Sequence, residues 1–204
     1  MIKNIIFDFG GVMHDVSSLT EERENIHKAL KIKEGDEELE KIRLEAVSRL
    51  GSGQLNEQEY WQELSSKFSI PIPENHHELH RAALRDHSDP YPQMFDLVEC
   101  LKEAGYNVFV LSNSIPPHAE VLRAKGWYDS FHRVLLSQDL GHNKPDKRIF
   151  EKALQKLNIK ADETLFIDDR KENLVPAREL GMNTLLAHSP DRTVIEVKKL
   201  LHLK

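Results

Sequence analysis

Five short apolar runs, separated by longer stretches of another character, constrain the fold more than any other feature of this chain. The runs lie at residues 4–9, 106–113, 133–138, 163–169 and 182–187. Stretches between the later runs carry apolar residues at helical spacing, such as Ile149, Ala153 and Leu157 after Pro145. Short apolar strands that alternate with amphipathic helices predict a parallel sheet covered by helices on both faces. The sequence therefore predicts an α/β fold of three layers.

The region between the first and second runs is of a different kind. Residues 16–86 contain no strand-like run but several helical segments, one of which starts at Asn56 with a Glu three residues later, as in a capping box. We therefore predict a sheet-containing core made of residues 1–15 and 87–204, and a helical insert made of residues 16–86. The segment Gly51-Ser-Gly-Gln is predicted to be a linker between two helices of the insert.

Charge and cysteine content narrow the class of partner and the compartment. The formal net charge is −6, which argues against binding to nucleic acid or to an anionic membrane surface. Cys100 is the single cysteine, which excludes an internal disulfide, and no apolar run is long enough to span a bilayer. We therefore expect a cytoplasmic protein. No exposed apolar seam is evident in the pattern, which favours a monomer or a weak homodimer.

Polar residues follow three of the predicted strands and precede one predicted helix. They are Asp8, Ser112, Asn113, Asp168 and Asp169 at strand ends, and Lys144 before the helix that follows Pro145. Ligands of open parallel sheets bind beyond the carboxyl ends of the strands, so we expect these side chains to converge. Three neighbouring carboxylates raise one another's pKa values, and a hard divalent cation such as Mg²⁺ relieves that conflict. A phosphate beside that ion would contact Lys144 and Ser112, which leaves one carboxylate free to attack phosphorus.

In this order, these residues resemble the haloacid dehalogenase superfamily, most of whose members are phosphatases. The matching segments are Phe7-Asp-Phe-Gly-Gly-Val, Leu111-Ser-Asn-Ser, Lys144-Pro-Asp-Lys-Arg-Ile-Phe, and the stretch from Phe166-Ile-Asp-Asp to Met182. The resemblance implies a Rossmann-like core with the helical insert as its cap domain, and Mg²⁺ as cofactor.

The resemblance also implies roles for individual residues. It makes Asp8 the nucleophile, Lys144 the residue that steadies it, and Ser112 the phosphate-binding hydroxyl. It implies Mg²⁺ contacts from Asp8, from the main-chain carbonyl of Gly10, from Asp169 directly and from Asp168 through water. Asn113 and the main-chain N–H groups of Phe9 and Gly10 would complete a phosphate cup.

The chain departs from the family pattern at Gly10, where related phosphatases usually carry a second aspartate. That aspartate protonates the leaving alcohol and then activates water, and general acid–base help of this kind is worth about 10²- to 10⁴-fold in rate. A subgroup with the same Asp-x-Gly-Gly-Val form resembles sugar-phosphate phosphatases, so the glycine does not by itself imply an inactive protein. Water, the substrate, a residue of the insert, and the nearby His14 and Asp15 are the candidate replacements.

The leading prediction is a Mg²⁺-dependent phosphomonoesterase that acts on a small phosphorylated metabolite, such as a sugar phosphate, through an aspartyl-phosphate. Two alternatives stay open. Metal-independent 2-haloacid dehalogenases also lack the second aspartate, and a weakly catalytic module that binds a phosphorylated ligand would also fit Gly10. His76, His77 and His80 are expected to form a solvated surface cluster, because no Glu or Cys stands at a standard zinc spacing.

Overall fold

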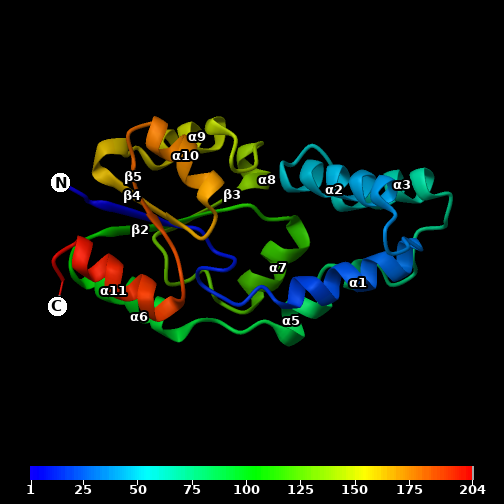
Figure 1. Ribbon diagram of the computed structural model, residues 1–204, viewed down its shortest axis with the longest axis horizontal. Helices are drawn as coiled ribbons and strands as arrows, with labels where there is room; N and C mark the ends of the chain where they lie inside the picture. The colour runs from blue at the N-terminus through cyan, green and yellow to red at the C-terminus, as the bar shows by residue number, and fades with distance from the viewer. Residues whose placement is uncertain (204) are drawn as a thin grey trace.

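A computed structural model describes residues 1–203 and places a five-stranded sheet in one half of the molecule (Figure 1). The strands are β1 (Asn4–Phe7), β2 (Asn107–Ser112), β3 (Arg133–Leu136), β4 (Thr164–Asp168) and β5 (Asn183–Leu186). Their order is β3-β2-β1-β4-β5, and every neighbouring pair is parallel. The predicted α/β fold is confirmed. Because the chain crosses from one side of β1 to the other after β3, ligands are expected at the carboxyl ends of β1 and β4.

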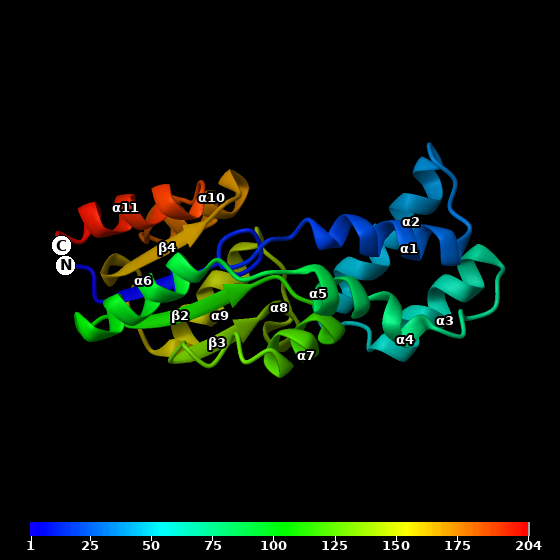
Figure 2. The same cartoon turned by 90° about the horizontal axis from the view of Figure 1, so that it is seen from below.

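Helices cover both faces of the sheet. The helices are α1 (Ser18–Leu30), α2 (Glu37–Gly51), α3 (Glu57–Phe68), α4 (His76–Leu79), α5 (Ala82–His87), α6 (Pro92–Glu103), α7 (Pro116–Ala124), α8 (Ser137–Leu140), α9 (Lys147–Leu157), α10 (Lys171–Glu179) and α11 (Pro190–Leu200), with a 3₁₀ turn at Ala161–Glu163. Figures 1 and 2 show α6 and α11 on one face and α9 and α10 on the other. Within residues 1–203, no helix combines the length and the apolar character needed to cross a membrane.

Successive side chains of β1 show why the sheet is buried on both faces. Ile5 and Phe7 pack in a cluster that includes residues of α6 and α11, whereas Ile6 packs in a second cluster with residues of α9 and α10. All three side chains are fully buried. An apolar residue at every position of a strand is typical of a parallel sheet between two helical layers.

The helices α1–α4 extend from the carboxyl edge of the sheet, toward the right of Figures 1 and 2, and form a third hydrophobic cluster that also takes in Ile115 of the core. Tyr60, Trp61 and Leu64 of α3 are buried at its centre. Leu84 of α5 packs in the first cluster. The predicted capping box is present at the start of α3, since Asn56 and Glu59 each accept a hydrogen bond from the other's main-chain N–H. The boundaries of core and helical insert at residues 15/16 and 86/87 stay a prediction.

The predicted linker after α2 has a second role that the sequence did not indicate. The predicted strand at 133–138 ends at Leu136, and the short helix α8 begins at Ser137. The start of α8 contacts the turn formed by the predicted linker. Ser137 Oγ lies 2.6 Å from the carbonyl oxygen of Gly51. Gly53 has a φ of 68°, and a Cβ there would lie 2.4 Å from the carbonyl oxygen of Gln138. The turn is therefore a contact between the helical insert and the core, and it requires glycine at position 53.

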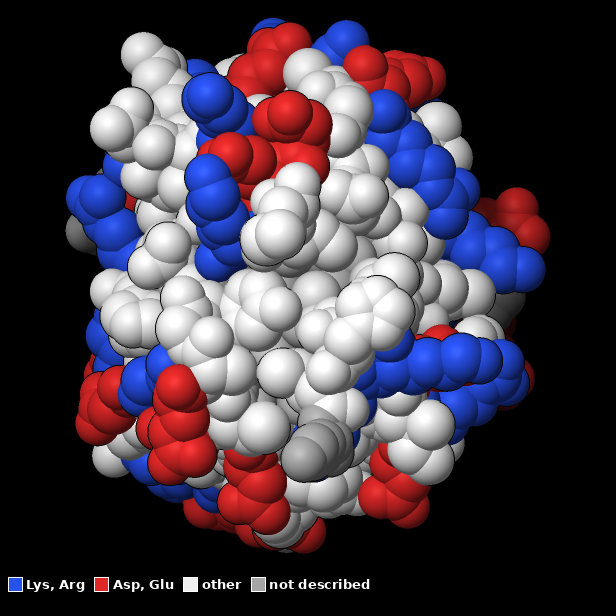
Figure 3. All heavy atoms as spheres, turned by 90° about the vertical axis from the view of Figure 1, so that its left-hand side faces the viewer, with Lys and Arg blue, Asp and Glu red and all other residues white. Residues whose placement is uncertain are grey.

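Figure 3 shows the end of the molecule that lies at the left of Figure 1, where both chain termini are found. Acidic and basic side chains are interspersed on this face around an uncharged middle. Although the formal net charge is −6, the described residues of this face therefore form no continuous acidic patch.

Candidate active site

The carboxyl ends of β1, β2 and β4 bring the predicted acidic residues and Ser112 to one edge of the sheet. Phe7 of β1 pairs with Ile167 of β4. The residues that follow this pair, Asp8 and Asp168, therefore lie side by side where the two strands end. One carboxylate oxygen from each of Asp8, Asp168 and Asp169 lies within 4.8 Å of the other two. Side chains that are up to 161 residues apart in the sequence thus meet around one point.

Lys144 is the cation of this cluster. Its Nζ lies 2.8 Å from Asp8 Oδ1 and 2.7 Å from Asp168 Oδ2, and its side chain is only 1% exposed. Asn113 fixes the main chain of Lys144, because its Oδ1 accepts from the Lys144 N–H at 2.7 Å and its Nδ2 donates to the Lys144 carbonyl at 2.9 Å. Both ends of the Asn113 amide are occupied in this way, so its side chain holds the main chain of Lys144. Its role in the phosphate cup stays a prediction.

Asp168 and Asp169 are adjacent but differ in their surroundings. Asp168 is fully buried, and its oxygens accept hydrogen bonds from Lys144, from Asn173 Nδ2 at 3.0 Å each, and from the Arg170 N–H at 2.9 Å. Asp169 is exposed, and its Oδ2 faces Gly11, whose Cβ, if present, would lie 2.7 Å away. Gly11 also has a φ of 77°, so the glycine that follows Gly10 is required both by its backbone and by Asp169.

The electrostatics of the cluster show an excess of negative charge. Burial raises the pKa of Asp8 to about 6, Asp168 adds to the rise, and Lys144 opposes it. Burial and the charge of Asp168 also raise the pKa of Asp169. Three carboxylates face one ammonium group, and their oxygens lie close enough together to share an ion. This set of hard oxygen donors fits Mg²⁺. Within residues 1–203 no other residue donates a hydrogen bond to the Asp169 carboxylate, which leaves it accessible to an ion.

A small hollow of about 60 Å³ lies beside Gly10. It is lined by Phe9, Gly10, His14, Val16, Leu19, Leu84, Ser112, Asn113, Ser114, His118 and Leu122. Phe9, Gly10, Ser112 and Asn113 are the predicted phosphate-cup residues, and the Phe9 N–H already donates to Asp8 Oδ1 at 2.7 Å. Val16, Leu19 and Leu84 come from the helical insert, which therefore covers the hollow from one side.

The two residues considered as neighbours of Gly10 take different positions. A Cβ at Gly10 would lie 3.2 Å from Val16 Cγ1 and 3.8 Å from His14 Nε2. His14 therefore reaches the space that a second aspartate would enter. Asp15 does not, because its carboxylate accepts hydrogen bonds from the main-chain N–H and the hydroxyl of Ser17.

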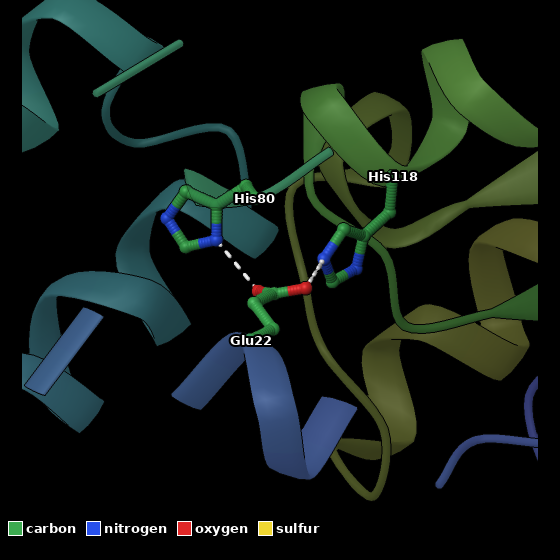
Figure 4. A group of neighbouring side chains, drawn as sticks. All are labelled: Glu22, His80 and His118. Carbon is green, nitrogen blue, oxygen red and sulfur yellow. Dashed lines mark hydrogen bonds and ion pairs between the residues drawn. The ribbon is translucent and has the colours of Figure 1, made fainter. Parts of the chain in front are cut away.

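A second buried cluster lies where the helical insert meets the core, and the sequence analysis did not find it. Glu22 of α1 is placed between two histidines, His80 after α4 and His118 of α7 (Figure 4). Its Oε1 lies 2.7 Å from His80 Nδ1, and its Oε2 lies 2.7 Å from His118 Nε2. Burial alone would raise the pKa of Glu22, but His118 and His80 outweigh it and lower the pKa to about 2.

The prediction of a solvated histidine cluster is wrong for His80. His80 is 1% exposed, whereas His77 is exposed and His76 is bonded to the Pro73 carbonyl. The sequence did carry a signal for this cluster. Glu22 precedes Ile26 by four residues and Leu30 by eight, so it lies on the same face of α1 as these two buried apolar side chains. A carboxylate on such a face requires buried donors.

Comparison with known proteins gives relatives along nearly the whole chain. The chain is 29% identical over 196 residues to a D-ribitol-5-phosphate phosphatase of Bacteroides thetaiotaomicron, with 90% of this chain and 91% of that protein covered. It is 27% identical to a glyceraldehyde 3-phosphate phosphatase of Methanopyrus kandleri, with 91% and 83% covered. None of these sequence identities assigns a substrate to the present chain.

Solved structures give the same result. A haloacid dehalogenase-family enzyme of Bacteroides thetaiotaomicron, determined with magnesium and inorganic phosphate, matches with a TM-score of 0.74 and 25% identity, and the match covers 93% of this chain and 96% of that one. The sequence-family model of the haloacid dehalogenase-like hydrolases matches residues 2–181 of this chain. With the sheet order and the acidic edge described above, these matches show that the chain belongs to the haloacid dehalogenase-like hydrolase family.

Proposed function

We propose that this chain is a Mg²⁺-dependent phosphomonoesterase that acts through an aspartyl-phosphate on Asp8. The observation that carries the proposal is the geometry of Asp8. Its Oδ1 is held by Lys144 Nζ at 2.8 Å and by the Phe9 N–H at 2.7 Å, which leaves Oδ2 as the attacking atom. Relatives named as phosphatases of small polyol and sugar phosphates support the reaction class. They also favour such a phosphate as the substrate here.

Each residue of the acidic edge has a role in this reaction. Asp8 Oδ2 would form a bond to phosphorus as the bond to the ester oxygen breaks, and Lys144 and the Ser112 hydroxyl would bind the charged phosphoryl oxygens. Asp169, Asp8 and the Gly10 carbonyl would hold Mg²⁺, and Asp168 would act on it through water. When bound, the ion would supply the positive charge that this cluster lacks. Asn113 and Asn173 would position Lys144 and Asp168.

The helical insert would serve as a cap. Val16, Leu19 and Leu84 already cover the hollow beside Gly10, which would exclude water from a bound phosphate. Substrate selection would therefore depend on residues 16–86, with 1–15 and 87–204 as the catalytic core. The single cysteine supports a reducing, cytoplasmic compartment.

The test is phosphate release from a panel of polyol phosphates, sugar phosphates and nucleotides, with Mg²⁺ and with EDTA. We expect turnover only with Mg²⁺, and a phosphoenzyme that is trapped by acid in the wild type but not in Asp8→Asn. Halide release from a 2-haloacid that is insensitive to EDTA would instead indicate a dehalogenase. Tight binding of a phosphometabolite without turnover would indicate a binding module.

A further inference from the structure

The hollow beside Gly10 needs a group that exchanges protons with the substrate, and the glycine does not supply one. Among the residues that line the hollow, His14 and His118 are the ionisable ones. Either imidazole could in principle give a proton to a leaving oxygen and take one from water. Their hydrogen bonds distinguish them.

His118 has the hydrogen-bond arrangement of an oriented acid–base histidine. Its Nε2 lies 2.7 Å from Glu22 Oε2, and Glu22 is ionised at neutral pH, so Nε2 carries a proton and donates it (Figure 4). The other nitrogen, Nδ1, makes no hydrogen bond with any side chain or main-chain group of residues 1–203. A carboxylate on one ring nitrogen fixes the tautomer and stabilises the imidazolium form, which leaves the opposite nitrogen to exchange protons.

Glu22 is itself held in place. His80 Nδ1 donates to its other oxygen at 2.7 Å, and the His80 ring lies 5.3 Å from the Tyr60 ring and 5.6 Å from the Trp61 ring. His80 Nε2 is buried and has no hydrogen-bond partner within residues 1–203, so a proton there would be unsatisfied. His80 is therefore a neutral donor that fixes the carboxylate, and Glu22 cannot turn away from His118.

His14 lacks this support. Its Nδ1 lies 2.8 Å from the Asp15 carbonyl and 2.9 Å from Ser88 Oγ, both of which are neutral. No carboxylate is bonded to its ring among the described residues. An imidazolium at His14 would therefore be buried without a counter-ion.

We propose that the His118 imidazole, oriented by Glu22, is the acid–base group that replaces the aspartate absent at Gly10. This inference rests on the proposed phosphatase function. As the bond from phosphorus to the ester oxygen breaks, His118 Nδ1–H gives its proton to that oxygen, and the alcohol leaves. His118 Nδ1 then takes a proton from water as the water oxygen bonds to phosphorus and the bond from phosphorus to Asp8 breaks, which regenerates both groups. Glu22 and His80 are positioning residues.

The test compares an alkyl phosphate with 4-nitrophenyl phosphate, because nitrophenolate leaves without a proton and an alkoxide does not. We choose His118→Gln, whose amide keeps a donor toward Glu22 but exchanges no proton, and His118→Ala as the second variant. With the alkyl phosphate, formation of the phosphoenzyme should slow by about 10²- to 10⁴-fold. With the nitrophenyl ester, a rapid burst of one nitrophenolate per enzyme should be followed by slow turnover, because the water step has lost its base.

The split between kcat and KM gives a second readout. Glu22→Gln removes the carboxylate that orients the His118 ring, so kcat for the alkyl phosphate should fall while its KM and the nitrophenolate burst change little. The charged and titratable groups that act on this pair include His80, His14, Arg43 of α2, Tyr60 of α3 and, through His80, Glu57 of α3. All of these stay in the variant.

The matched control is the exposed pair Glu21–His87, which joins the same helix α1 to α5 with an Oε2 to Nδ1 distance of 2.6 Å. Glu21→Gln and His87→Ala should leave kcat and KM for both substrates unchanged. The inference is overturned if His118→Gln slows formation of the phosphoenzyme equally with both substrates or with neither, or if His14→Ala gives the leaving-group dependence instead. Failure of the proposed function is distinguishable, because the wild type would then form no phosphoenzyme at all.

Discussion

Two buried carboxylate clusters of this molecule have opposite charge balance. At the sheet edge, three carboxylates share Lys144, and the pKa of Asp8 is raised to about 6. At the junction of insert and core, one carboxylate is shared by two imidazoles, and the pKa of Glu22 is lowered to about 2. Burial acts in the same direction on both carboxylates, toward a higher pKa.

The difference therefore lies in the partners. Glu22 has a donor on each oxygen and is satisfied by the protein alone, which suits a group that fixes another side chain. Asp8 has one cation shared with a second anion, so its site is complete only with further positive charge. A site of the first kind should lose stability when its carboxylate is neutralised, and a site of the second kind should lose function.

The largest expected effect is on activity in Asp8→Asn. Removing the nucleophile should lower kcat by about 10⁴- to 10⁶-fold, as found for nucleophiles that act as part of a catalytic unit. The free energy of unfolding in EDTA should stay equal or rise, because one of three crowded anions is gone. Steady-state phosphate release and urea unfolding measure the two quantities. Comparable loss of stability in Asp8→Asn would show that the two clusters do not differ as described.

The next largest effect is on stability in Glu22→Gln. The folded pKa of about 2 lies below the unfolded value of 4.5, so ionised Glu22 stabilises the folded state above pH 4.5, and this contribution is lost as the pH falls toward 2. A difference of roughly two and a half pKa units corresponds to about 3 kcal/mol as an upper bound. Urea unfolding at pH 7 and at pH 3 should show the variant less stable at pH 7 and closer to wild type at pH 3. A deficit that is the same at both pH values would contradict the assignment.

The sequence predicted the sheet edge well and the junction poorly, and the reason is physical. Asp8, Asp168 and Asp169 follow buried strands directly, so the parallel register alone brings them together. The pairing of Glu22 with His118 depends on how α1 packs against α7, and nothing local in either helix encodes that angle. The burial of Glu22 was readable from its spacing to Ile26 and Leu30, but the identity of its partners was not.

Addition of Mg²⁺ should stabilise the protein through the sheet edge alone. At an ion concentration of 100 times Kd, binding contributes about 2.7 kcal/mol, which corresponds to a rise in Tm of about 5–10 °C for a chain of this size. Asp169→Asn should lose most of the rise, since no other residue of the described chain 1–203 donates to that carboxylate, whereas Glu22→Gln should keep it. Thermal unfolding with and without EDTA measures this. An equal rise in both variants would place the ion elsewhere.

The smallest effect concerns a second joint between insert and core, which is uncharged. Ser137 Oγ is fully buried, accepts from the Ser114 N–H at 3.0 Å and donates to the Gly51 carbonyl at 2.6 Å. Ser137→Ala leaves both main-chain groups without this partner and should cost about 1–3 kcal/mol of unfolding free energy. The exposed Ser66→Ala of α3 should change it by less than about 0.5 kcal/mol.

Because no ionisable group takes part in the Ser137 joint, its deficit should be the same at pH 7 and at pH 4, where the Glu22→Gln deficit has begun to shrink. Urea unfolding of both variants at the two pH values separates a neutral joint from a charged one. If the Ser137→Ala deficit also fell with pH, the two joints would be coupled through the packing of the insert on the core. The charge of Glu22 would then not be the property that distinguishes them.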